Sequence, residues 1–176
     1  MENHTGPKEI AMVEYRNILF CTDFSEDANI AFLHALDLAK KHDARLHIFH
    51  VPHSSYAYCR HVVDEHVSEE SPGGEAFYGE EITKRAKEAL KEAYAKRIGD
   101  FKNYEWVVKN GSPDIEIIRY AKKNHIDVIV MGALGKSEID RIEHGSTVAN
   151  VSKYAHCHVI AIRNPAKRFT LPGNIY

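Results

Sequence analysis

The stretch from His125 to Ser152, HIDVIVMGALGKSEIDRIEHGSTVANVS, most strongly limits what this chain can fold into. Residues 126–131 are almost entirely apolar and β-branched, which is typical of a strand buried on both faces of a parallel sheet. Three glycines and a Ser-Thr pair that opens an apolar-periodic helix follow: Gly132, Gly135, Gly145, Ser146 and Thr147. Glycines let backbone N–H groups approach an anion, and a helix start adds unpaired donors. The pattern therefore predicts a phosphate-binding loop.

Two common phosphate loops do not fit these residues. A Walker A loop would need a glycine at position 130 before Gly135-Lys136-Ser137, and Val130 is there instead. The dinucleotide pattern G-x-G-x-x-G also fails, since Gly132 and Gly135 lack a third glycine at the right distance. The loop is therefore of a different kind.

Composition narrows the class of protein. With 176 residues, the chain is long enough for one domain with its own core. Twenty-three basic and twenty-five acidic side chains give a formal charge of -2 without a basic stripe, which argues against nucleic-acid binding. Three cysteines without a C-x-x-C pair favour a reducing compartment. Because we find neither a signal peptide nor an apolar run of membrane-spanning length, we expect a cytoplasmic protein that does not bind membranes.

Hydrophobic periodicity and turn residues predict five strands alternating with four helices. The strands are expected at residues 16–21, 45–51, 104–109, 126–131 and 158–163. The helices are expected after Ser25 to about residue 41, at 75–98, at 113–124 behind an N-cap at Ser112, and from the Ser146-Thr147 pair to about 155. We expect tails at 1–14 and 164–176, one domain at 15–163, and an insertion at 52–74. We interpret the insertion as a mobile surface segment, and alternatively as a lid or a partner-facing flap.

This alternation predicts a single α/β domain: a doubly wound, five-stranded parallel sheet in the order 3-2-1-4-5, with helices on both faces. In such sheets ligands bind beyond the carboxyl ends of the strands, where the winding direction reverses. That point lies between the first and fourth strands. The residues expected there are Cys21, Thr22, Asp23, Met131 and Gly132.

The residue types at this point suit an adenine nucleotide. The Asp23 carboxylate can accept hydrogen bonds from two vicinal ribose hydroxyls, and Gly132 leaves room for the sugar. The backbone of Val51, at the end of the neighbouring strand, can offer an N–H and a C=O to an adenine edge. The expected phosphate contacts are Gly135, Gly145, Ser146 and Thr147.

Four features occur together in this chain: the opening ILFCTDFSEDA, the strand LHIFHV, the strand DVIVMG, and the ending GALG…HGSTVANVS…CHVIAIR. With the spacing of Gly132, two residues, Gly135, nine residues, Gly145 and Ser146, they closely resemble the universal stress protein family over about residues 15–163. The resemblance implies an adenine nucleotide alpha hydrolase-like fold and bound ATP or AMP. It also implies a homodimer in which the last strands, at 158–163, pair edge to edge.

The sequence departs from the family pattern in three places. Cys21 stands where a proline usually precedes Thr-Asp, and Leu134 stands where a polar or basic residue is common near the phosphates. Lys136 is the alternative source of positive charge. The spacer at 136–144 is more charged than the apolar spacer usual in the family, and it includes Glu138, Asp140 and Glu143. Those carboxylates could repel a triphosphate or help hold a divalent cation, magnesium or manganese, carried by the phosphates, and both readings stay open.

Some of these residues also fit a structural role. Asp23 with Glu26 has the shape of a capping box, and Ser146 and Thr147 are natural N-caps. The histidines are numerous, but His47, His50 and His53, three apart on a strand, would alternate between its faces, which argues against a metal site. A pH-sensitive surface or dimer interface is another role for the histidines. Cys157 is expected to be packed rather than reactive.

Three functions follow as hypotheses. The first is a regulatory homodimer in stress response, whose nucleotide state controls binding of an unidentified protein partner. The second is a slow ATP hydrolase or phosphotransferase, at most a weak ATPase or autophosphorylating protein. Its only candidate groups near a γ-phosphate are Asp140, Glu143 and His144, so we assign no catalytic residue. The third is a nucleotide-free protein that binds partners.

Overall fold

The structure is a computed structural model that describes residues 13–52, 74–135 and 147–166. The side chains of 74–79 are not among those described. The strands are β1 (Asn17–Cys21), β2 (Arg45–His50), β3 (Tyr104–Val108), β4 (Val128–Gly132) and β5 (His158–Ile162). The helices are α1 (Glu26–His42), α3 (Gly74–Ile98), α4 (Pro113–Lys123) and α5 (Thr147–Tyr154). The predicted insertion at 52–74, apart from its first and last residues, lies outside the described residues, as do most of the two predicted tails.

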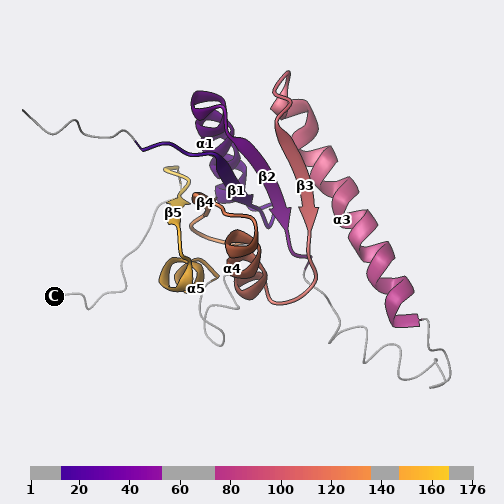
Figure 1. The fold of residues 1–176 in the computed structure, drawn as a ribbon. Coiled ribbons are helices and arrows are strands. Elements are labelled where there is room, and N and C mark those ends of the chain that lie inside the picture. Colours follow the sequence, from indigo (N-terminus) through magenta and orange to yellow (C-terminus); the bar gives the residue numbers. More distant parts are fainter. Residues whose placement is uncertain (1–12, 53–73, 136–146, 167–176) are drawn as a thin grey trace, which may run out of the picture.

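All five strands are parallel and lie in the order β3-β2-β1-β4-β5 (Figure 1), which confirms the predicted fold class. The chain winds from β1 through β2 to β3 in one direction, and β4 and β5 are added on the other side of β1. Cys21, at the end of β1, lies opposite Phe49 of β2 and Met131 of β4. The winding direction therefore reverses between β1 and β4, as predicted.

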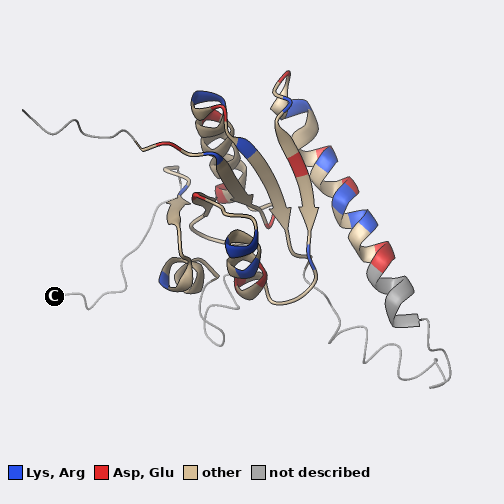
Figure 2. Ribbon diagram, in the orientation of Figure 1, with Lys and Arg blue, Asp and Glu red and all other residues tan. Residues whose placement is uncertain are grey.

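Helices cover both faces of the sheet. α1 and α3 pack on one face through a buried cluster that includes Ile18, Phe20, Phe32, Leu46, Leu90, Tyr94 and Val130. α4 and α5 pack on the other face through a second cluster that includes Leu19, Cys21, Phe49, Ile117, Ile129, Met131 and Val151. Figure 2 shows that Lys, Arg, Asp and Glu are concentrated on the helices, whereas β1, β4 and β5 carry none. The alternation of strand residues between two apolar layers is what makes these strands read as continuous hydrophobic runs.

The fourth strand begins two residues later than predicted, and the end of α4 uses the first of these residues. His125 has a left-handed φ of 50°, and the Ile126 N–H donates to the carbonyl of Ala121 at 3.0 Å. This is the hydrogen bond of a Schellman motif, in which a left-handed residue lets the chain turn back over the last helical turn. Ile126 is therefore a buried helix-end contact rather than a strand residue.

A carboxylate fixes β1 and β4 together at their amino ends. Asp127 Oδ2 accepts the N–H of Arg16 at 2.7 Å and the N–H of Asn17 at 2.8 Å. The Asp127 N–H in turn donates to the Asn17 carbonyl at 2.9 Å. Hydrogen bonds to an ionised acceptor are about twice as strong as neutral ones, so this pairing sets the register of the two central strands.

His47 and His50 point to opposite faces of β2, as their spacing predicts. His50 Nδ1 lies 2.7 Å from the Thr22 carbonyl oxygen, whereas His47 is buried on the α4 side. There its Nδ1 lies 2.8 Å from Glu105 Oε1 and 2.9 Å from the Tyr120 hydroxyl. Its Nε2 is buried and makes no hydrogen bond among the described residues. Burial lowers the pKa of His47 and outweighs the nearby Glu105 carboxylate, which acts in the opposite direction.

The lowered pKa predicts that acid destabilises the fold through His47. The neutral ring is favoured in the folded chain, so this stability is complete above the unfolded pKa of about 6.5 and is lost as pH falls toward the lowered folded pKa. The loss cannot exceed about 1.4 kcal/mol per pH unit for one proton. Urea unfolding between pH 7.5 and 5 should show a smaller fall for His47→Gln than for the unaltered chain. Equal pH dependence of the two would contradict the assignment to His47.

Candidate functional site

The predicted site lies beyond the carboxyl ends of β1 and β4. Because Cys21 and Met131 are register partners, the residues after them emerge side by side. A Cβ built on Gly135 would lie 2.9 Å from Asp23 Oδ2. The structure therefore brings together the carboxylate and the glycine loop that the sequence predicted to face each other.

Asp23 is half-exposed and does not cap α1. Its Oδ1 accepts the Ser25 N–H at 2.9 Å, which forms a local turn. The N-cap is Ser25, whose hydroxyl accepts the Ala28 N–H at 3.2 Å. The capping-box interpretation of Asp23 is thus wrong in this structure, because the helix start is capped two residues later. Of the two Asp23 carboxylate oxygens, Oδ2 is the one that faces Gly135.

Thr22 is held by the protein interior. Its Oγ1 lies 2.7 Å from the Tyr94 hydroxyl and accepts the Phe24 N–H at 2.9 Å. Its backbone N–H donates to the Phe49 carbonyl, and its own carbonyl lies 2.7 Å from His50 Nδ1. Burial raises the pKa of Tyr94, and the hydrogen bond to Thr22 acts in the opposite direction. Thr22 therefore fixes the turn that carries Asp23.

Phe24 adopts a backbone conformation that is rare for its residue type. Its φ is 61°, in the left-handed region that costs a non-glycine residue roughly 1–2 kcal/mol. The ring stacks on Tyr94 with an interplanar angle of 14° and lies 4.6 Å from the His50 ring, centroid to centroid. These ring contacts offset the backbone cost and hold the turn next to Asp23.

Cys21, Val51 and Met131 are buried at the three strand ends, so their contribution to a ligand would come from the backbone. Burial raises the pKa of the Cys21 thiol well above its usual value, with Cys157 as a lesser cause. A buried thiol that stays protonated is chemically inert. Burial also raises the pKa of Cys157, which agrees with the expectation of a packed side chain.

Gly132 has a different role from the one predicted. A Cβ at this position would lie 2.6 Å from the Ala28 backbone nitrogen and 2.9 Å from the Asp27 carbonyl carbon. The space beside its Cα is therefore filled by the first turn of α1 rather than left for a sugar. Only glycine lets β4 end this close to the helix backbone.

Sequence analysis did not identify Asp27 as a residue of the site. Its side chain is fully buried. Oδ2 accepts the Leu134 N–H at 3.1 Å, and Oδ1 accepts the Asn164 N–H at 3.3 Å. The spacing could have revealed it, since Asp27 continues the buried row of Ala31 and Ala35 at intervals of four residues.

The first amides of the glycine loop already have protein acceptors. The Ala133 N–H donates to the Ile162 carbonyl at 2.7 Å, and the Leu134 N–H donates to Asp27. Donors for a phosphate would therefore come from Gly135 onward. Of the predicted contacts there, Lys136, Gly145 and Ser146 lie outside the described residues.

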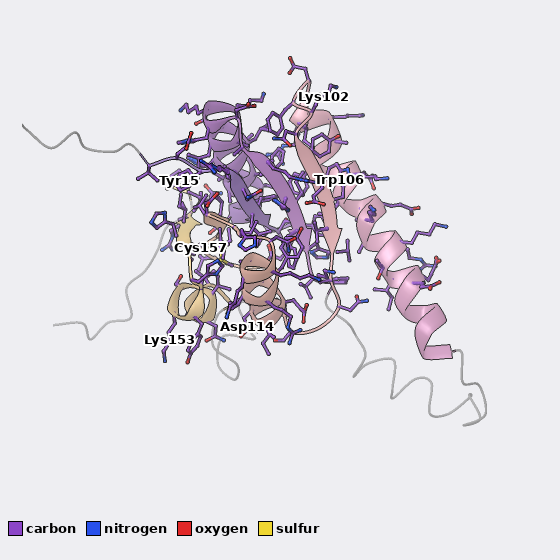
Figure 3. All side chains as sticks on the ribbon, viewed as in Figure 1. Tyr15, Lys102, Trp106, Asp114, Lys153 and Cys157 are labelled. Atoms are coloured by element: carbon purple, nitrogen blue, oxygen red, sulfur yellow. The ribbon has the colours of Figure 1, made fainter. Side chains whose placement is uncertain are left out.

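Thr147 is half-buried at the first position of α5. The neighbouring helix α4 holds α5 in place, because Asn150 Nδ2 donates to Asp114 Oδ2 at 2.6 Å. Asp114 is labelled in Figure 3. The hydroxyl of Ser112, at the N-cap of α4, donates to the same carboxylate at 2.6 Å instead of capping the helix. This bond is the main reason why the pKa of Asp114 is lowered.

Within the described ranges, no group of three His, Cys, Asp or Glu residues could hold a metal ion. His47 and His50 lie on opposite faces of the sheet, and His53 lies outside the described residues. No described helix is both long and apolar enough to cross a membrane.

Comparison with known proteins gives consistent matches. A model of the universal stress protein family matches residues 14–163. A universal stress protein of Methanocaldococcus jannaschii is 32% identical over 159 residues, covering 87% of this chain and 85% of its own length. A putative universal stress protein of Staphylococcus haemolyticus is 31% identical over 153 residues, covering 86% of this chain and 87% of its own length.

Solved structures show the same fold. Universal stress protein UspA of Lactobacillus plantarum is 30% identical with a TM-score of 0.64, covering 86% of this chain and all of its own. A universal stress protein crystallised in complex with cAMP has a TM-score of 0.53 at 22% identity, and covers 85% of this chain and 98% of its own. The second likeness concerns the fold alone.

Two glycines of one loop give a test of their separate roles. Gly132→Ala should lower the free energy of unfolding by about 1–3 kcal/mol, because its Cβ would meet helix backbone that cannot move aside. Gly135→Ala should change it by less than about 0.5 kcal/mol, because its Cβ would meet only the movable end of the Asp23 side chain. Urea unfolding measures both. Equal losses would contradict the close packing of Gly132 on α1.

Proposed function

Since this chain belongs to the universal stress protein family, we propose that it binds an adenine nucleotide, ATP or AMP, and acts as a regulatory homodimer in stress response. The observation that carries the proposal is the approach of Asp23 Oδ2 to Gly135 at the point where the winding of the sheet reverses. A half-exposed carboxylate beside a glycine turn, at the point where ligands bind in such sheets, is an acceptor for ribose hydroxyls.

The ligand would span the ends of three strands. The ribose would bind Asp23, and the adenine edge would meet the backbone of Val51 after β2. The phosphates would lie against Gly135, Lys136, Gly145, Ser146 and Thr147, with a magnesium or manganese ion carried by the phosphates. The Ala133 and Leu134 amides already donate to protein acceptors, which supports a phosphate position toward the α5 side of the loop.

The proposed location is the cytoplasm, and regulation would run through an unidentified protein partner. Two other functions are kept as alternatives. A slow ATP hydrolase or phosphotransferase would have to use groups such as His144, which lies outside the described residues. The second alternative is a protein that binds partners without a nucleotide. The close approach of Asp23 Oδ2 to Gly135 favours nucleotide binding over the nucleotide-free alternative.

The direct test is the nucleotide content of the purified protein. Chromatography of the denatured extract should release close to one adenine nucleotide per chain, or the emptied protein should bind added ATP or AMP by calorimetry. An empty protein that binds neither nucleotide would favour the nucleotide-free alternative. Steady phosphate release that is abolished by His144→Ala but not by Asp23→Ala would favour the hydrolase.

Asp23→Ala should weaken ATP binding by about tenfold to a hundredfold, because it removes a charged acceptor from the ribose hydroxyls. The matched control is Asp37→Ala, an exposed carboxylate on α1 that pairs with Lys41 away from the loop. Calorimetric titration of both variants measures the effect. Affinity unchanged by Asp23→Ala would place the ligand elsewhere.

The proposed homodimer follows from the position of β5 at an edge of the sheet. Its described hydrogen-bonded neighbour is β4 alone, so the other edge of β5 offers backbone donors and acceptors to a second copy. Sedimentation equilibrium should give twice the 20.0 kDa mass of one chain. A single-chain mass at micromolar concentration would contradict the dimer and leave the nucleotide site unaffected.

A further inference from the structure

The Asp27 side chain joins three segments that are far apart in the sequence. It belongs to the first turn of α1, accepts the Leu134 N–H of the loop after β4, and accepts the Asn164 N–H two residues after β5. The Leu134 contact lies on the inner side of the glycine loop that approaches Asp23. One carboxylate therefore holds both the loop of the proposed nucleotide site and the chain that leaves the edge strand.

The surroundings of Asp27 fix this arrangement tightly. The side chain is fully buried, and a buried carboxylate is tolerated when hydrogen-bond donors compensate for the water that it loses. A Cβ on Gly132 would lie only 3.0 Å from Asp27 Cβ, so the loop backbone packs directly on this side chain. The position of Leu134 is thus determined by α1 through contact and through a charged hydrogen bond.

We propose that Asp27 is a positioning residue of the nucleotide site, which aligns the glycine loop with Asp23 and couples the site to Asn164 beyond the edge strand. The inference rests on the proposed function. A ligand that contacts the loop changes the energy of the Leu134 hydrogen bond, and the shared carboxylate passes that change to Asn164. Such coupling is reciprocal, so events at the β5 end affect nucleotide affinity by the same factor.

The negative charge of Asp27 makes the sign of the effect informative. If its charge alone mattered, removing it would strengthen the binding of an anionic nucleotide, because like charges repel. If Asp27 aligns the loop, removing it weakens binding. The two roles therefore predict opposite changes in affinity.

The test compares ATP affinities of the full chain and its variants by calorimetry. Asp27→Ala removes both acceptors and should weaken binding by about tenfold or more. Asp27→Asn keeps one amide oxygen as an acceptor and should lose less. Leu36→Ala is the matched control, because it removes a buried side chain of the same helix, lowers stability and leaves the loop contacts intact.

The outcomes separate the two proposals. No ATP binding by the unaltered chain would overturn the proposed function, and this inference with it. Binding by the unaltered chain that Asp27→Ala leaves equal or strengthens would overturn the positioning role alone. So would an equal loss of affinity in Leu36→Ala at matched stability, since that would show a general effect of destabilisation.

Amide hydrogen exchange gives a readout that needs no folded Asp27→Ala variant. In the unaltered chain, ATP should slow exchange at both Leu134 and Asn164. In Asp27→Asn the slowing at Asn164 should shrink or disappear, whereas the Ala133 amide, bonded to Ile162, should stay protected. Exchange at Asn164 that ATP does not change in the unaltered chain would overturn the coupling.

Discussion

The parallel pairing of β1 with β4 is the interaction on which the candidate site depends. It is the pair at which the winding of the sheet reverses, so the loops after the two strands leave from the same edge. The register of Cys21 with Met131 sets Asp23 beside the glycine loop. Helix α1 then completes the arrangement, since its first turn packs on Gly132 and supplies the buried carboxylate beneath Leu134.

Local patterns in the sequence were sufficient to predict the architecture. Buried parallel strands appear as continuous apolar runs, and capped amphipathic helices lie between them, so the strand order was anticipated. The position of Asp23 beside the glycine loop was also anticipated, although Gly132 rather than Gly135 was expected to face it. The error at the start of the fourth strand has a local cause, because an apolar residue that closes a helix end cannot be told from a strand residue by hydrophobicity. The left-handed residue that ends α4 could not be recognised either, because this position is usually glycine and here it is His125.

What the sequence did not reveal depends on long-range polar contacts. Asp27 and Leu134, or Thr22 and Tyr94, meet only in the folded chain, and no periodicity indicates which buried donor a given acceptor will find. The contacts of Gly132 likewise could not be read from the sequence. Its glycine was correctly recognised as necessary, but the atoms that require it belong to α1 and not to a ligand.

Two carboxylates stand at opposite ends of the junction between β1 and β4. Asp127 binds the Arg16 and Asn17 amides where these strands begin, and Asp27 binds the Leu134 amide just after β4 ends. Separating the two strands to admit a ligand would break charged hydrogen bonds at both ends of the junction. A ligand at the carboxyl ends of these strands must therefore bind on top of a β1–β4 junction that stays closed.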